Sequence, residues 1–156
     1  MVSLNMYDLN CNKVIQDIFE LDKFITFVAI ANLANAKIIA TKYKEDDRLL
    51  PSSVLTRQES ELLTMQSLIR MSTRRTLEYK LGRALYSSTV YEKASTASIC
   101  LSADEQEREG GSDLILILTF DKNTDHELII KSKILPFLKE ENLRQYHKSM
   151  NFDVAS

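Results

Sequence analysis

Residues 56–82 read TRQESELLTMQSLIRMSTRRTLEYKLG, and this stretch decides the fold. Thr56 and Glu59 have the spacing of a capping box, in which the threonine oxygen accepts the Glu59 backbone N–H and the carboxylate accepts the Thr56 N–H. At the other end, Gly82 can adopt the left-handed conformation that ends a helix without a Cβ clash. About seven turns fit between these signals. The sequence therefore predicts one long helix with both ends defined.

This helix is amphipathic when its residues are placed at intervals of about 100°. Arg70, Arg74 and Glu78 fall on one side, and Leu63 and Met71 fall there with them. Single exposed apolar residues are ordinary, but two of them roughly two turns apart indicate contact with a second chain. We therefore predict partner binding through Leu63, Arg70, Met71 and Arg74. The opposite face is the predicted core, with small residues in its second half that suit packing on a sheet: Leu62, Met65, Leu68, Ile69, Ser72, Thr73, Thr76 and Tyr79.

The segments around this helix follow strand-like and helical patterns in turn. Residues 114–120 are apolar almost throughout, as expected of a central strand, and Pro136 should kink or break the last helix. This order predicts an α+β fold with five strands and flanking helices. The predicted elements are a helix at 10–21, strands at 24–31 and 38–43, the long helix, strands at 85–91, 97–101 and 114–120, and a helix at 127–139.

The length of 156 residues predicts one domain, because a chain of this size can bury a core without staples. We place that domain at residues 1–139. Residues 140–156 form a polar tail that is either a frayed helical extension or a segment that docks on a partner. Residues 103–113 carry five acidic side chains against one arginine and contain two adjacent glycines, so a solvated loop is expected there.

Composition excludes several classes of function. The chain carries 20 basic and 22 acidic residues, and a net charge of -2 argues against a nucleic-acid surface. No apolar run approaches the roughly 18 residues of a membrane span, so membrane insertion is not expected. Cys11 and Cys100 lie in apolar neighbourhoods and are predicted to be small buried residues rather than a disulfide. A reducing, cytoplasmic setting fits this usage.

Neither catalytic nor cofactor chemistry is indicated. His126 and His147 are the only histidines and neither stands in a nucleophile or metal-ligand motif. The three glycines cannot form a phosphate cradle, which needs several at fixed spacing. We therefore predict a non-enzymatic protein that holds neither a cofactor nor a metal.

Two further features have a functional and a structural interpretation. Arg74 and Arg75, with Arg70 one turn earlier, have the chemistry to bind a carboxylate or phosphate. The favoured alternative is a solvated helix face on which Arg74 pairs with Glu78. A small-molecule pocket between helix and sheet is the second feature, although aromatic residues there are more often core filling. The residues considered for its lining are Tyr79, Tyr86 and Phe120.

The element order resembles that of the roadblock, longin and profilin-like group, whose antiparallel five-stranded sheet is sandwiched between helices. More closely, residues 11–138 resemble a family of small uncharacterised archaeal proteins of that kind. The first hairpin departs from that pattern, with Asn35-Ala36-Lys37 in place of a glycine-containing turn, and the acidic loop resembles an insertion. The resemblance rests on residues 11–21 and 24–31, Leu49-Leu50-Pro51, residues 65–75, Leu81-Gly82 and Tyr91-Glu92-Lys93.

The resemblance implies a scaffold rather than an enzyme, and that family supplies no catalytic residues to carry over. Roadblock and longin modules commonly form homodimers or heterodimers and serve as platforms for small GTPases or larger complexes. We therefore expect a cytoplasmic module that dimerises through a sheet edge or the exposed side of the central helix. The alternative is a sensor module resembling PAS or GAF domains, with its ligand between sheet and helix.

Overall fold

The computed structural model describes residues 2–44, 55–101 and 113–139. The predicted tail at 140–156 and nearly all of the acidic loop lie outside the described residues. The elements, in chain order, are α1 (Val2–Phe19), β1 (Ile25–Asn32), β2 (Lys37–Tyr43), α2 (Arg57–Arg74), η1 (Arg75–Leu77), α3 (Glu78–Leu81), β3 (Tyr86–Val90), β4 (Ala94–Cys100), β5 (Leu114–Asp121), α5 (His126–Ile129), η2 (Ile130–Ile134) and α6 (Leu135–Lys139).

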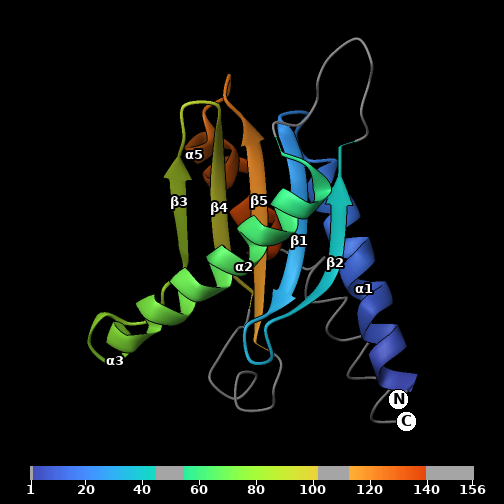
Figure 1. Ribbon diagram of the computed structural model, residues 1–156, viewed down its shortest axis with the longest axis vertical. Coiled ribbons are helices and arrows are strands. Elements are labelled where there is room, and N and C mark those ends of the chain that lie inside the picture. Colours follow the sequence, from blue (N-terminus) through green and yellow to red (C-terminus); the bar gives the residue numbers. More distant parts are fainter. Residues whose placement is uncertain (1, 45–54, 102–112, 140–156) are drawn as a thin grey trace.

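The strands form one sheet in the order β2-β1-β5-β4-β3, and every neighbouring pair is antiparallel (Figure 1). The predicted α+β fold with a five-stranded antiparallel sheet is thereby confirmed. β5 lies at the centre of the sheet with a strand paired to each edge, and its residues 114–120 are buried because apolar clusters cover both of its faces. The order leaves β2 and β3 as the two edge strands.

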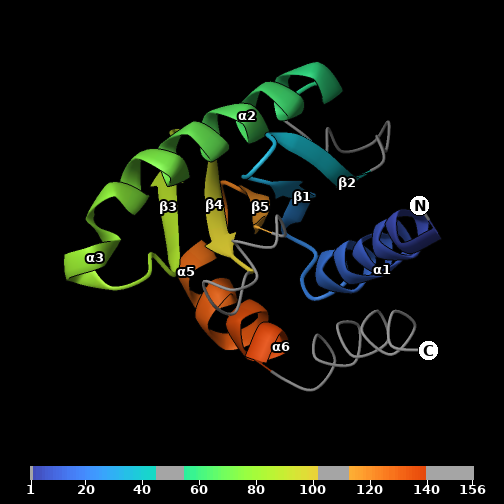
Figure 2. The ribbon, with the colours of Figure 1, turned by 90° about the horizontal axis from the view of Figure 1, so that it is seen from below.

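Helices cover both faces of the sheet (Figure 2). α1 and the segment from α5 to α6 lie on one face, where Ile18, Leu116 and Ile130 belong to the larger apolar cluster. α2 lies on the other face, over a smaller cluster that includes Ala29 and Met71. Among the described helices and strands, the outer helix surfaces and the two sheet edges therefore remain accessible to a partner (Figure 2).

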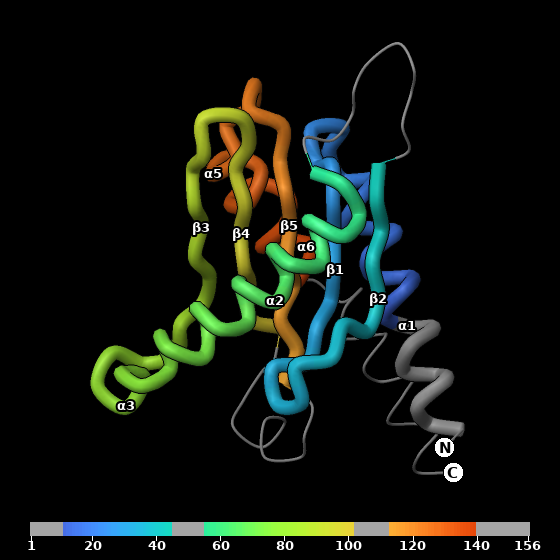
Figure 3. The backbone as a smooth tube through the Cα atoms, in the orientation of Figure 1, coloured from blue at the N-terminus to red at the C-terminus, as the bar shows by residue number. Residues whose placement is uncertain are grey.

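The long helix has the predicted ends but is not continuous. Its capping box is present, with Glu59 N donating to Thr56 Oγ1 at 3.2 Å and Thr56 N donating to Glu59 Oε1 at 2.9 Å. Gly82 ends α3 with φ 81°, and its N–H donates to the Glu78 carbonyl. Between these two ends the helix tightens to the 3₁₀ form in η1. Figure 3 shows the path of the backbone from α2 to α3. The Thr73 hydroxyl donates to the Ile69 carbonyl at 3.0 Å, a local bond that bends helices.

The predicted buried face of α2 is wrong, and the correction changes the candidate site. Leu63 and Met71 are 7% and 0% exposed, whereas Leu62 and Ile69, predicted to face the core, are 59% and 65% exposed. The periodicity argument followed the most apolar residues, but the sheet selects the face that lets the helix approach closely. That face is rich in small residues, and the buried residues of α2 are Ser60, Leu63, Thr64, Ser67, Leu68 and Met71.

Two local predictions concern proline and glycine chemistry. Pro136 lacks the N–H that a regular helix needs at this position. The π-helical segment η2 lies just before it, and there the Leu135 N–H donates to the Ile130 carbonyl. In the first hairpin, Ala36 takes a positive φ of 56° in place of the expected glycine. The predicted irregularity near Pro136 is confirmed.

The remaining sequence predictions on cysteines and membranes can also be compared with the structure. Cys11 is buried in the larger cluster as predicted, Cys100 is only partly buried, and the two cysteines do not form a disulfide with each other. Among the described helices, none has the length and hydropathy needed to cross a bilayer.

A polar contact ties the last helices to the start of the sheet. Lys133 Nζ lies 2.7 Å from Asp22 Oδ2, and the Phe24 backbone N–H donates to Asp22 Oδ1 at 2.9 Å. Burial acts to raise the pKa of Asp22, but these two hydrogen bonds and the positive charges of Lys133 and Lys23 outweigh it and lower the pKa below 3.8. The ionised carboxylate therefore stabilises the fold.

Replacing Asp22 with asparagine should lower the free energy of unfolding at pH 7 by about 1 kcal/mol, since the pair is partly exposed. A lowered pKa means that the contribution is present above the unfolded-state value and is lost as pH falls through the folded-state value. Urea titrations of both proteins should therefore differ at pH 7 and converge only as the pH falls through the lowered pKa of Asp22. A difference that persists at low pH would contradict this assignment.

The corrected face of α2 makes a second prediction. Met71→Ala should cost about 2 to 5 kcal/mol, because it leaves a cavity in the core. Arg74→Ala, three residues on and exposed, should change stability by less than about 0.5 kcal/mol. Chemical denaturation of the two variants measures both, and equally small effects would contradict the burial of Met71.

Candidate interaction surface

Exposed apolar side chains are concentrated in one part of the molecule. Of the nine large apolar residues exposed within the described ranges, eight fall between residues 62 and 91. They occupy the outer side of α2, the end of the helical segment and the neighbourhood of β3, whereas the ninth, Leu128, lies on α5. Contiguous exposed apolar surface marks interaction sites. The eight residues are Leu62, Ile69, Leu77, Tyr79, Leu81, Leu85, Val90 and Tyr91.

The helical segment projects past the edge of the sheet. α2 crosses the sheet diagonally, and α3 lies beyond β3 (Figure 1). We call η1 and α3, residues 75–81, the α3 tip. Tyr79 and Leu81 in this tip are 79% and 80% exposed. An apolar projection of this kind has little to pack against within its own chain.

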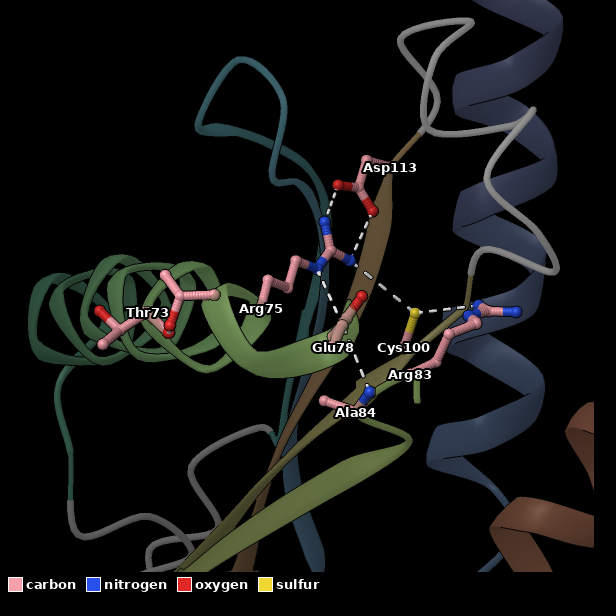
Figure 4. A network of polar contacts seen from close by, with 8 residues as sticks. Thr73, Arg75, Glu78, Arg83, Ala84, Cys100 and Asp113 are labelled. Carbon is pink, nitrogen blue, oxygen red and sulfur yellow. Dashed lines mark hydrogen bonds and ion pairs between the residues drawn. The ribbon is translucent and has the colours of Figure 1, made fainter. Parts of the chain in front are cut away.

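A buried ion pair fixes the direction of the α3 tip (Figure 4). The Arg75 guanidinium binds both carboxylate oxygens of Asp113, with Nη2 at 2.7 Å from Oδ1. Both side chains are largely buried, so the two-pronged geometry holds the tip against the start of β5. Glu78 lies on the other side of Arg75, with Oε1 3.8 Å from Nε, and it accepts the Ala84 backbone N–H at 3.2 Å. The tip is thus anchored at both of its ends.

Cys100 completes this network from β4. Its Sγ lies 3.4 Å from Arg83 Nη2 and 3.9 Å from Arg75 Nη2. The sulfur therefore links the tip to the loop that enters β3. The sequence could not show this contact, because the residues come from three separate segments.

The structure changes both interpretations of the arginine pair, because Glu78 contacts Arg75 where the sequence predicted Arg74. Arg75 binds a carboxylate of its own chain, so the predicted recognition chemistry is used internally. Arg74 is exposed and Arg70 is half-buried, while Glu78 faces Arg75. Of the predicted partner-binding residues, the two arginines thus lie at the surface and Leu63 and Met71 do not.

Within the described residues, no strand pairs with the outer edge of β3. Cys100 N donates to the Leu85 carbonyl and Tyr91 N donates to the Ala94 carbonyl. Hydrogen-bonded positions alternate along an antiparallel strand. The N–H and C=O groups of Tyr86, Ser88 and Val90 therefore point away from β4, toward the open edge.

The two edges of the sheet differ in protection. β2 carries Lys37 and Lys42, contains a bulge where Ile39 has no opposite residue on β1, and lies against α1. Lysines, bulges and a covering helix all discourage strand addition. β3, YSSTV, has neither charge nor proline, and its pairing with β4 is regular. β3 is therefore the edge open to strand addition.

Hydrogen bonds on the far face of the sheet hold β3 in place. Ser88 Oγ donates to Glu127 Oε1 at 2.9 Å, and Tyr86 Oη donates to Glu127 Oε2 at 3.2 Å. Glu127 belongs to α5, so the edge strand is tied to the helical layer. Such support keeps the strand extended before any partner binds.

A cavity of about 320 Å³ lies between the first half of α2 and the turn from β3 to β4. Thr119 is 5% exposed, and its Oγ1 has no hydrogen-bond partner within the described part of the chain. A buried hydroxyl without a partner is costly. The residues that line the cavity are Leu55, Glu59, Leu62, Leu63, Gln66, Tyr91, Lys93, Ala94, Thr96 and Thr119.

This cavity is not the pocket considered from the sequence. Phe120 is fully buried on the opposite face of the sheet, and Tyr79 is almost fully exposed. Within the described residues, there is also no cluster of three or more histidine, cysteine or acidic side chains that could hold a metal ion.

Sequence reasoning missed Leu62 and Ile69 because it placed both on the core face of the long helix, and it assigned Leu81 to neither face. The overlooked signal was the spacing of Ser60, Thr64 and Ser67, which marks a face that packs closely on a sheet.

Comparison with known proteins identifies the fold. No protein-family profile and no curated protein sequence matches the chain. The solved structure of the gliding protein MglB from Thermus thermophilus has a TM-score of 0.63 at 10% identity and covers 90% of each chain. Myxococcus xanthus MglB gives 0.58 at 13% identity, covering 94% of this chain and 91% of that one. A roadblock/LC7 domain from Streptomyces avermitilis gives 0.50 at 7% identity, with coverages of 85% and 88%. The chain therefore has a roadblock/LC7-like fold.

The anchoring role of Arg75 can be tested against its neighbour. Arg75→Met should lower the free energy of unfolding by about 3 kcal/mol, because it removes the guanidinium from a buried carboxylate. The amides of residues 78–84 should also exchange faster in hydrogen-exchange measurements. Arg74→Met is the matched control and should leave both quantities unchanged. Equal behaviour of the two variants would contradict the anchoring role.

Proposed function

We propose that this chain is a non-enzymatic, roadblock-like interaction module that dimerises through β3. The open edge of β3 carries the proposal, because its outward backbone groups are unprotected and exposed apolar residues surround it. A strand added there gains main-chain hydrogen bonds, and the apolar residues supply the buried area. A second copy of the chain is the simplest partner, and a related chain would form a heterodimer in the same way.

The geometry of such a dimer follows from the strand. Two identical β3 strands that pair antiparallel are related by a two-fold axis perpendicular to the sheet. The sheet then continues from one copy into the other, and both α2 helices lie on the same face. One structure similar to this chain is of MglB with a tetrameric arrangement. A protein of this fold can therefore form oligomers, which supports the proposal.

The partner beyond the dimer is a further part of the proposal. By the resemblance to roadblock modules, the exposed side of α2 would serve as a platform for a small GTPase or a larger complex. Arg70 and Arg74 remain proposed contacts, with Leu62 and Ile69 in place of the buried Leu63 and Met71. The same proposal includes three further points. They are a relation to archaeal proteins, a cytoplasmic setting, and a single domain at residues 1–139 with a tail at 140–156.

A second candidate function is a sensor module that binds a small molecule. The cavity beside α2 favours it, since its volume lies at the lower end of the range of about 300–1,000 Å³ known for ligand pockets. Its lining combines apolar residues such as Leu62 and Leu63 with the polar residues Glu59, Gln66, Lys93, Thr96 and Thr119. The dimer ranks first because the β3 edge and the exposed apolar residues have no role in this alternative.

Substituting Ser88 separates dimerisation from folding. Ser88→Pro removes an outward N–H without interrupting the pairing with β4, and proline is tolerated on such edges. The variant should be monomeric by light scattering at concentrations where the parent is dimeric. Ser88→Ala also loses the bond to Glu127 but keeps the N–H, so it should remain dimeric. A parent protein that is monomeric across micromolar concentrations would refute the dimer.

A further inference from the structure

We propose that the α3 tip of a second copy fills the cavity beside α2, so that each copy completes the cavity of the other. The inference rests on the proposed β3 pairing and adds a specific occupant for the cavity. It assigns a role to Tyr79 and Leu81, which the fold of a single chain leaves exposed.

The symmetry of the pairing brings these parts together. The α3 tip lies beside the end of β3 where the strand begins, and the turn from β3 to β4 lies at the opposite end (Figure 1). A two-fold axis through β3 exchanges these ends, so the partner's tip arrives beside the turn. Tyr91, Lys93 and Ala94 at this turn form one wall of the cavity.

The cavity and the tip match in chemistry. Leu62, Tyr91 and Ala94 give the cavity an apolar lining, and Leu81 supplies an apolar side chain that such a lining can shield from water. Tyr79 presents an aromatic ring with a hydroxyl at its end, which can donate or accept a hydrogen bond. In the proposed dimer, Tyr79 of the second copy packs its ring against this apolar lining.

The tip is also organised before binding. Arg75 and Asp113 fix its direction, and Gly82 ends it with a defined turn. Less conformational freedom is therefore lost when the tip enters the cavity, and preorganisation of this kind strengthens association. The same rigidity explains why the apolar projection does not fold back on its own chain.

Cross-linking between two different cysteine variants tests whether the α3 tip of a second copy lies in the cavity. Lys80→Cys places a thiol on the tip and Lys93→Cys places one at the cavity wall, and both lysines are exposed. A mixture of the two variants, treated with a short bis-maleimide, should give a covalent dimer. Lys80→Cys mixed with Lys37→Cys, whose thiol lies on the far edge strand, should not, and the unsubstituted chain controls for Cys11 and Cys100.

Affinity provides the second measurement. Tyr79→Ala should raise the dimer Kd at least tenfold in sedimentation, whereas Leu128→Ala, which truncates another exposed apolar side chain on α5, should not change it. Two results together would overturn this inference while the β3 pairing stands: the Lys80→Cys and Lys93→Cys variants dimerise but give no cross-link, and Tyr79→Ala dimerises with the Kd of the parent protein. A monomer at all concentrations would remove both. A metabolite released from the cavity on denaturation and identified by mass spectrometry would also overturn it.

Discussion

The close approach of α2 to the sheet is the constraint on which the rest of the structure depends. Small residues such as Ser60 and Ser67 are buried on the side of α2 that faces the sheet. On β1, the residues of the same layer include the small Ala29 and Ala31. Because this contact needs small side chains, it turns Leu62 and Ile69 outward despite their apolar character. It also sets the diagonal path that carries α3 past the edge of the sheet (Figure 1).

The two edge strands show how one sheet can be protected on one side and available on the other. β2 has lysines, a bulge and a covering helix, while β3 is short, uncharged and regular. Glu127 on α5 holds β3 through the hydrogen bond from Ser88. The Arg75–Asp113 pair holds the α3 tip against the start of β5. Both supports act through residues distant in the chain. They give the exposed apolar surface a fixed shape, which is what specific association requires.

Much of the fold was predictable because local signals agree with one another. The capping box at Thr56, the glycine at 82 and the apolar run at 114–120 each have a direct physical cause and appear as predicted. The face of α2 was not predictable in this way. Both sides of the helix carry apolar residues, and only the surface beneath decides which side is buried. The candidate site depended on that decision, so Leu63 and Met71 were misplaced while Arg74 was not.

The sequence by itself determined the element order and the absence of recognisable catalytic motifs, since these depend on residue type and short-range spacing. The antiparallel α+β class followed from the resemblance of that order to the roadblock, longin and profilin-like group. The tertiary structure alone decided which edge is open, where the Arg75 guanidinium binds, and that a cavity lies beside α2. Those features join residues separated by tens of positions, such as Arg75 and Asp113 or Leu62 and Thr119. Long-range proximity has no local sequence signal, so it emerges only when the sheet is assembled.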